Sequence, residues 1–402
     1  MSRLIKSILC MSLAACMLLC GCGAPQESQS ETTAETTAET TAAATTVPAK
    51  PAATIDETAN VKRYDFLSIK QKTDEINSAF NGYVSERRFK GVIYMKLGND
   101  FEYLSATGSS DANNHKNNSI NTRFYIGALT EQMTAAAVLS LVDSDKLSLD
   151  DTIDKFFPDY KYGEDITVDN LLNMTSGIPN YIVRSDISDM AANLHIAIND
   201  DIKEDNSFDE NKKIILDWIL SQDLRFEPSS SFENSDSNYY LLGEIIAKVS
   251  GESYEDYIYS AIFKPLAMNA TSFDGGDKLA LPYDGNAEGD KLCFSGVGYS
   301  ACGMISNISD LLKWTDGIFY DKIISDESIN KMRTPTENGY SCGMYISGDR
   351  LSASGRCGAY SSMLSYTTDK SEIFVSLSNY NFSDPSFLRG LFRKYLSKFS
   401  AG

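Results

Sequence analysis

The chain has 402 residues, in which 55 acidic side chains outnumber 36 basic ones and give a formal net charge of −19. This acidity argues against nucleic acid, and against an anionic lipid surface, as direct binding partners. With 19 Phe and 22 Tyr in the chain, the long segment after residue 60 can bury a large core, either as one domain or as two fused lobes.

The first 21 residues have the pattern of a secretory signal peptide. Arg3 and Lys6 precede an apolar run at residues 8–19, which is too short to span a membrane. The sequence LCGC at residues 19–22 resembles the lipobox of bacterial lipoproteins, and Cys22 is the one cysteine with Gly directly before it. We therefore expect an extracytoplasmic lipoprotein, anchored to the bacterial cell membrane only through acyl chains on Cys22. An uncleaved anchor and plain secretion are the alternatives.

The segment after Cys22 is a predicted linker. Residues 23–60 consist largely of Thr, Ala, Glu, Pro and Ser, and the sequence ETTA occurs three times in a row from residue 31. Such a composition has almost nothing to bury, so we expect a disordered tether. The predicted organisation is a signal peptide at residues 1–21, a linker at 22–60 and a folded domain at 61–402.

Alternating periods of apolar residues give the coarse secondary structure of the domain. In chain order, the predicted elements are a hairpin at residues 89–95 and 101–105, a buried helix at 134–147, helices at 212–220 and 239–249, strands at 364–367 and 373–378, and an amphipathic helix at 385–399. Strands, then helices, then strands predict an α+β fold. In this fold, an antiparallel sheet flanked by helices is built from both ends of the domain, and a mainly helical lobe at about residues 128–275 is inserted in it.

The cysteines and histidines of the domain do not indicate a metal site. The four cysteines of the domain are Cys293, Cys302, Cys342 and Cys357. Four cysteines allow three pairings, and the sequence leaves all three open. His115 and His195 have no partners at ligand spacing, and no Cys-x-x-Cys occurs, so we expect neither a metal nor a cofactor.

Residues 124–136 (FYIGALTEQMTAA) form the stretch most suggestive of chemistry. An apolar strand end, a Gly and a helix of small residues place a group at a helix N-terminus, where the dipole and free amides favour developing negative charge. The stretch resembles the active-site helix of penicillin-recognising serine hydrolases, the class C β-lactamase and D,D-peptidase superfamily, with the pattern Phe-x-Ile-Gly-Ser-x-Thr-Lys. Aligned without a gap, the nucleophilic Ser falls on Ala128 and the Lys falls on Glu131.

The resemblance extends along the domain. Residues 147–158, 166–179, 240–251 and 262–268 are similar, in the same order, to segments of that superfamily, with Met174 where its Leu-Leu-x-His-Thr-Ser-Gly signature has His. These matches imply a β-lactamase/transpeptidase-like fold. They do not imply activity, because one fold hosts many functions.

Two further catalytic motifs of the superfamily are altered as well. Its Tyr-x-Asn motif falls on Asn234 and Asp236, so the phenol that moves a proton is replaced by an amide. Its Lys-Thr-Gly or His-x-Gly motif falls on Ala353, Ser354 and Gly355, so the cation that meets a substrate carboxylate is missing.

The resemblance also implies what the former site keeps. An oxyanion hole made of backbone amides needs no particular side chain, so the amides of Ala128 and Arg356 can still form one. An oxyanion hole without a nucleophile can bind a ligand, but it cannot catalyse the ligand's hydrolysis. The positions expected to line the groove are Ala128, Glu131, Asn234, Asp236, Ser354, Gly355 and Arg356.

Other residues were weighed as replacements for the lost groups. Ser328 and Lys331 form the chain's one Ser-x-x-Lys, in a polar segment where we expect a surface helix and a chance match. Thr130 is two residues past Ala128 and should point elsewhere. Glu131 reads as an ordinary first-turn acid whose carboxylate the helix dipole favours, and a Glu131–Asp236 pair for acid–base work is the alternative.

These losses change the charge of the groove. With two acids and neither Lys nor His, the groove should repel a β-lactam or a D-Ala-D-Ala terminus, because each carries a carboxylate. The sequence favours a non-catalytic relative whose former active-site cleft binds a neutral or cationic ligand, cell-wall material or a partner protein. One alternative is an active serine hydrolase (D,D-peptidase, esterase or β-lactamase) with a Ser beside Lys or Tyr in the cleft. The other is a structural surface protein with a collapsed cleft.

Overall fold

The structure is a computed structural model that describes residues 78, 81–82, 89–99, 101–184, 194–197, 201–285, 287–289, 296–320 and 323–399. The chain divides into residues 1–54 and 55–402, and all the described residues belong to the second unit. The predicted signal peptide, the linker, Cys22 and Cys293 lie outside the described residues, so what the sequence predicts for them stays a prediction.

One antiparallel sheet, with strands from both ends of the domain, forms the centre of the described unit. Its seven strands lie in the order β11-β12-β13-β14-β15-β1-β2, and neighbouring strands are antiparallel. The strands are β1 (Gly91–Leu97), β2 (Phe101–Thr107), β11 (Tyr340–Ser341), β12 (Met344–Ser347), β13 (Arg350–Cys357), β14 (Tyr360–Thr367) and β15 (Glu372–Ser378). The predicted hairpin and the predicted C-terminal strands are confirmed, and so is a sheet built from both ends of the domain.

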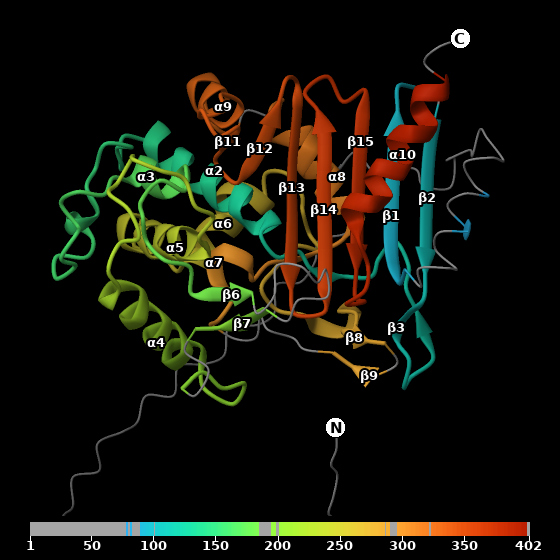
Figure 1. Ribbon diagram of the computed structural model, residues 1–402, viewed down its shortest axis with the longest axis horizontal. Helices are drawn as coiled ribbons and strands as arrows, with labels where there is room; N and C mark the ends of the chain where they lie inside the picture. Colours follow the sequence, from blue (N-terminus) through green and yellow to red (C-terminus); the bar gives the residue numbers. More distant parts are fainter. Residues whose placement is uncertain are drawn as a thin grey trace, which may run out of the picture. The chain divides into compact units, whose positions relative to one another are not determined.

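Helices cover both faces of this sheet. Helix α10 (Pro385–Phe399) crosses one face and α8 (Ile308–Gly317) lies behind the other (Figure 1). Side chains alternate along a strand, so Ile93 and Met95 of β1 pack with Phe392 of α10, whereas Val92 and Tyr94 join the main core on the opposite face. The central strand β14 is therefore buried along its whole length.

The mainly helical part lies beside the sheet and is drawn on the left of Figure 1. Its helices are α3 (Val168–Leu172), α4 (Phe208–Ser221), α5 (Asp236–Ser250), α6 (Tyr254–Ile258) and α7 (Tyr299–Cys302). Helix α9 (Asp326–Arg333) lies near β11. Within the described ranges, none of the helices combines the length and the apolar character needed to cross a lipid bilayer.

Short strand pairs complete the fold. They are β3 (Ser109–Asp111) with β4 (Lys116–Asn117), β5 (Phe124–Tyr125) with β10 (Ile305–Ser306), β6 (Ile182–Arg184) with β7 (Leu194–Ile196), and β8 (Tyr283–Asp284) with β9 (Ala287–Glu288). The β6–β7 hairpin interrupts a region that the sequence predicts as mainly helical.

Helix α2 (Leu129–Asp143) lies between the helical part and the sheet. Most of its residues are buried, so it lacks the polar face of a surface helix. The sequence places this helix at residues 134–147, and the structure corrects both ends. The helix begins at Leu129 because the first turn, with its polar Thr130, Glu131 and Gln132, is itself buried among other elements.

Candidate active-site cleft

The N-terminus of α2 lies directly against the backbone of β13. Gly127 has φ +54°, and a Cβ atom on it would lie 2.7 Å from the nitrogen of Arg356. A Cβ on Gly355 would lie 2.7 Å from the nitrogen of Ala128, and closer still to the oxygen of Ile126. Only glycine fits such a close approach of two main chains. The structure thus brings Ala128, Gly355 and Arg356 together, as the sequence predicts.

Ala128 stands at the head of α2, at the position where the sequence resemblance places the nucleophile of the superfamily. Ala128 is the N-cap of α2, with φ −62° and ψ −2°, and its side chain forms no cap. Because the alanine side chain has no oxygen, the group at the head of the helix has neither a lone pair for attack nor a proton for a base to remove.

Glu131 is buried at the first turn of α2, with 6 % of its surface exposed. The Tyr340 hydroxyl donates a hydrogen bond of 3.1 Å to its Oε2 atom. Burial, and then the charge of Asp236, raise the pKa of Glu131 well above its ordinary value, and the Tyr340 bond lowers it only in part. The dipole at this helix end favours a carboxylate, whereas burial and the charge of Asp236 oppose one.

Aromatic rings from both halves of the molecule surround this acid. The Tyr340 ring lies 5.5 Å from that of Phe232, which precedes α5, and 5.2 Å from that of Tyr345 on β12. Tyr345 is 43 % exposed. Sequence reasoning missed Tyr340 and Tyr345, and their one signal is a pair of tyrosines around the Cys342–Gly343 turn, which matches no motif.

The altered Tyr-x-Asn segment reaches both α2 and β12. The Asn234 side-chain amide donates a 2.6 Å hydrogen bond to the Tyr345 hydroxyl, so it joins the two halves across the cleft. Asp236 begins α5 and accepts a 2.8 Å bond from the side chain of Asn180. Glu233, directly before this segment, pairs with Arg225 at 2.8 Å.

Met174 supports the start of α5 where the superfamily has His. Its sulfur atom accepts a 3.4 Å bond from the Ser235 N–H and a 3.2 Å bond from the Asn238 side chain. The backbone of Met174 has φ +59°, an uncommon conformation for this residue type. A weak sulfur acceptor thus replaces an imidazole and keeps the segment beside the cleft in place.

The third motif supplies backbone and no cation. Ala353 is buried on β13, whereas Ser354 is exposed. The guanidinium of Arg356 donates bonds of 3.1 and 3.0 Å to the carbonyl and side-chain oxygens of Asn381, in the loop after β15. Arg356 therefore contributes its main chain to the cleft while its charge is held at that loop.

The residues weighed as replacements have structural contacts. Thr130 is buried, and its hydroxyl accepts a 3.3 Å bond from the Met304 N–H. On α9, the Ser328 hydroxyl donates a 2.6 Å bond to Asp143, and Lys331 pairs with Asp169. The surface helix expected for the Ser-x-x-Lys match is confirmed, and neither group belongs to the cleft.

The cysteines of the described region are in two states. Cys302 and Cys342 are buried thiols that form no disulfide, and burial raises the pKa of Cys342 to about 11. Cys357 is disulfide-bonded. In the described ranges, no three His, Cys, Asp or Glu side chains are grouped as metal ligands.

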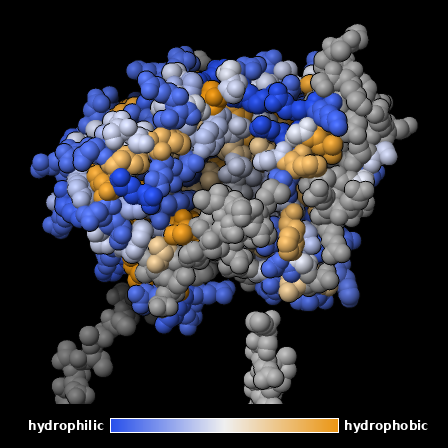
Figure 2. Space-filling view, in the orientation of Figure 1, coloured by the Kyte–Doolittle hydropathy of each residue, from blue (hydrophilic) through white to orange (hydrophobic). Residues whose placement is uncertain are grey.

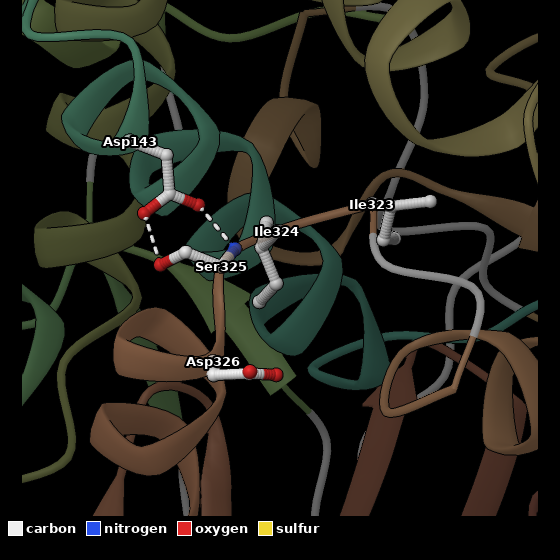
Figure 3. Close-up of a pocket in the computed structure, with 5 residues that line it drawn as sticks. All are labelled: Asp143, Ile323, Ile324, Ser325 and Asp326. Atoms are coloured by element: carbon white, nitrogen blue, oxygen red, sulfur yellow. Dashed lines mark hydrogen bonds between the residues drawn. The ribbon is translucent and has the colours of Figure 1, made fainter.

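A separate pocket of about 380 Å³ lies at the opposite end of α2, lined by Asp143, Ile323, Ile324, Ser325 and Asp326. Asp143 accepts bonds of 2.6 Å from both the N–H and the hydroxyl of Ser325 (Figure 3). This carboxylate thus ties the start of α9 to the end of α2.

On the face drawn in Figure 2, the surface between the helical part and the sheet is pale, whereas the helical part is mostly blue.

Comparison with known proteins gives the family. The model of the Beta-lactamase family matches residues 76–394, so the chain belongs to this family. PbpX of Bacillus subtilis (strain 168), named as a penicillin-binding protein, is 28 % identical over 345 residues, which cover 83 % of this chain and 82 % of PbpX. The membership predicted from the altered motifs is confirmed.

Solved structures agree on the fold. FmtA from Staphylococcus aureus superposes with a TM-score of 0.66 at 20 % identity, covering 82 % of this chain and 90 % of FmtA. A class C β-lactamase superposes with a TM-score of 0.65 at 17 % identity, covering 81 % of this chain and 95 % of that enzyme. At these identities the likeness concerns the fold, and the predicted β-lactamase-like α+β architecture is confirmed.

Proposed function

We propose that this protein is a catalytically silent member of the Beta-lactamase family, which binds a ligand in the former active-site cleft without acylation. One observation carries the proposal: a methyl group at position 128 stands where the family needs a nucleophile, inside an intact backbone frame. Acyl transfer begins with an oxygen or sulfur nucleophile and a base beside it. Ala128 has no such atom, and the buried acid of Glu131 favours its protonated form, which cannot act as a base.

The retained frame supports binding of a carbonyl group. Close packing of Gly127 on Gly355 keeps the amides of Ala128 and Arg356 at one place. Two backbone amides that hold an oxyanion in an active relative also attract the partial negative charge of an amide or ester oxygen. The silent cleft therefore suits an acyl compound that is held and not cleaved.

The charge of the cleft supports a neutral or cationic ligand. Asp236 carries the negative charge that raises the pKa of Glu131. Among the described residues of the three motifs, the one cation is Arg356, and its guanidinium binds Asn381 in the loop after β15. A ligand carboxylate would meet repulsion without a compensating cation. Cell-wall material with a blocked carboxyl group, or a partner protein, matches this chemistry.

We also propose where the protein acts. The signal-like residues 1–21 and the lipobox-like residues before Cys22 support an extracytoplasmic lipoprotein, held on the cell membrane by acyl chains. The Thr-, Ala- and Glu-rich residues to 60 then act as a tether. Metabolic labelling with a fatty-acid analogue tests this, with a Cys22→Ala variant as the control that must lose the label.

The catalytic half of the proposal is tested with a fluorescent penicillin. The purified protein is incubated with the probe, denatured and separated by electrophoresis, beside a class C β-lactamase as the positive control. We expect no labelled band for this protein, because Ala128 offers no hydroxyl. A labelled band at the mature mass would refute catalytic silence.

The binding half is tested by calorimetry with two matched ligands, an acyl-D-Ala-D-Ala with a free carboxylate and the same peptide with a C-terminal amide. We expect the amide to bind at least about tenfold more tightly, since 1.4 kcal/mol of charge repulsion is a tenfold change. In an Asp236→Asn variant the difference should shrink. Equal binding of both peptides contradicts the charge argument, and binding of neither contradicts the carbonyl-holding cleft.

A further inference from the structure

A two-stranded hairpin closes over the first turn of α2. The turn between β11 and β12 has positive φ at both Cys342 (+49°) and Gly343 (+83°). A Cβ atom on Gly343 would clash with the backbone nitrogen of Gln132, so the turn lies against the helix backbone. At the start of this hairpin, the Tyr340 hydroxyl donates its buried bond to Glu131.

The same hairpin also reaches across the cleft. Tyr345 on β12 accepts the 2.6 Å bond from Asn234, which belongs to the segment before α5. The Tyr340 ring contacts both Tyr345 and Phe232, so one cluster of rings includes the hairpin and this segment. Any outward movement of the hairpin would therefore break the Asn234 bond and widen the cleft.

The surroundings of Glu131 suit a neutral acid and not a carboxylate. The titratable groups of the described chain that interact with it are Asp236 and Tyr239 on α5, Cys302 on α7 and Tyr340 on β11. All four become more negative or stay neutral as pH rises, and none is a cation. An ionised Glu131 would keep a single phenol donor in a buried place, which is a costly state.

We propose that the β11–β12 hairpin is a proton-dependent latch, because it covers Glu131 on the first turn of α2 and supplies only the Tyr340 hydroxyl to a carboxylate buried there. While Glu131 keeps its proton, the β11–β12 hairpin stays on the first turn of α2. When Glu131 loses that proton to solvent, the hairpin moves away, water reaches the carboxylate, and the Asn234–Tyr345 bond opens. The latch controls access to the cleft, and it operates whether or not the cleft holds the ligand class proposed above.

Hydrogen exchange measured by mass spectrometry tests the latch on the intact domain from pH 5 to 8. Rates are corrected for the intrinsic pH dependence of exchange, and peptides covering 336–347 are compared with peptides of β14 and β15. Between the ordinary pKa of a Glu and the raised one, hairpin opening should increase about tenfold for each pH unit. The central strands should show no such increase.

A Glu131→Gln variant is the matched control, because its amide accepts the Tyr340 bond and cannot ionise. We expect protection of the hairpin in this variant to be independent of pH. A wild-type hairpin without pH dependence, or equal slopes in both proteins, would overturn the latch.

A native reporter keeps the test decisive if that variant does not fold. The Trp314 indole donates a 2.6 Å bond to the side chain of Gln132, next to Glu131 on α2, and Trp314 is fully buried. In a Trp218→Phe background, the emission of Trp314 should shift to the red over the same pH range as hairpin opening. A constant emission across that range contradicts opening at this turn.

Discussion

The two ends of helix α2 each carry a carboxyl group, and the two groups differ in burial and in hydrogen-bond partners. Glu131 at the N-terminus is buried and bonded to one phenol, and its acid form is favoured. Asp143 at the C-terminus is exposed and accepts three bonds of 2.6 Å, two from Ser325 (Figure 3) and one from Ser328.

The helix dipole alone would stabilise a carboxylate at Glu131 and destabilise one at Asp143. It favours negative charge at the N-terminus and opposes it at the C-terminus. Access to water and hydrogen-bond donors acts beside the dipole, because a buried carboxylate loses its solvation. At Asp143 both are available, and the N-terminus of α9 supplies the donors. At Glu131, burial and the charge of Asp236 both oppose the carboxylate form.

The largest expected effect comes from the frame at the N-terminal end. A Gly355→Ala variant places a methyl group inside the contact with Ile126 and Ala128. Overpacking of this kind should reduce the free energy of unfolding by about 3 kcal/mol, measured by urea denaturation. Gly390→Ala on α10 is the control, since nothing lies within 4 Å of its new methyl group. If both variants are equally stable, the two main chains are not in close contact.

The next largest effect is the pH dependence of stability that the buried Glu131 should cause. Because burial raises the pKa of Glu131 above its unfolded value, the folded state binds an extra proton, and stability falls as pH rises from the unfolded to the folded pKa. Glu131→Gln should match wild type near pH 4 and exceed it above, by about 1.4 kcal/mol for each unit of raised pKa. Thermal unfolding across this range measures the difference. A difference that does not change with pH would mean that Glu131 is charged in the folded protein.

Removal of the exposed acid should cost less. Asp143→Ala takes away the acceptor of the Ser325 and Ser328 bonds and should lower the free energy of unfolding by about 1–2 kcal/mol. A double-mutant cycle with Ser325→Ala isolates the pair. Additive losses in that cycle would show that the two ends of α2 and α9 are not coupled.

The smallest expected effect concerns a single phenol. Tyr340→Phe keeps the ring contacts with Phe232 and Tyr345 and removes the bond to Glu131. We expect a loss of about 1 kcal/mol at low pH, measured by chemical denaturation, since a typical hydrogen bond contributes about that much. The hydroxyl also bonds Tyr239, so a loss several times larger than one hydrogen bond contributes would contradict this expectation.

The sequence was sufficient for the fold and for the frame of the site. Ordered motifs predicted the family, and the resemblance placed Gly127 and Gly355 at the site. The start of α2 was misplaced because its first turn carries polar residues, which look exposed in a pattern and are buried by tertiary contacts. The environment of Glu131 was beyond prediction, because Tyr340 lies 209 residues away and no motif links the two.

A silent cleft must hold no group that reacts with an acyl donor. Intact-mass spectrometry tests it most directly, after incubation with a penicillin and, separately, with a reactive ester, using a class C β-lactamase as the acylated control. We predict an unchanged mass for this protein with both reagents. A stable adduct whose peptide map places it on a hydroxyl or thiol lining the cleft would contradict the account.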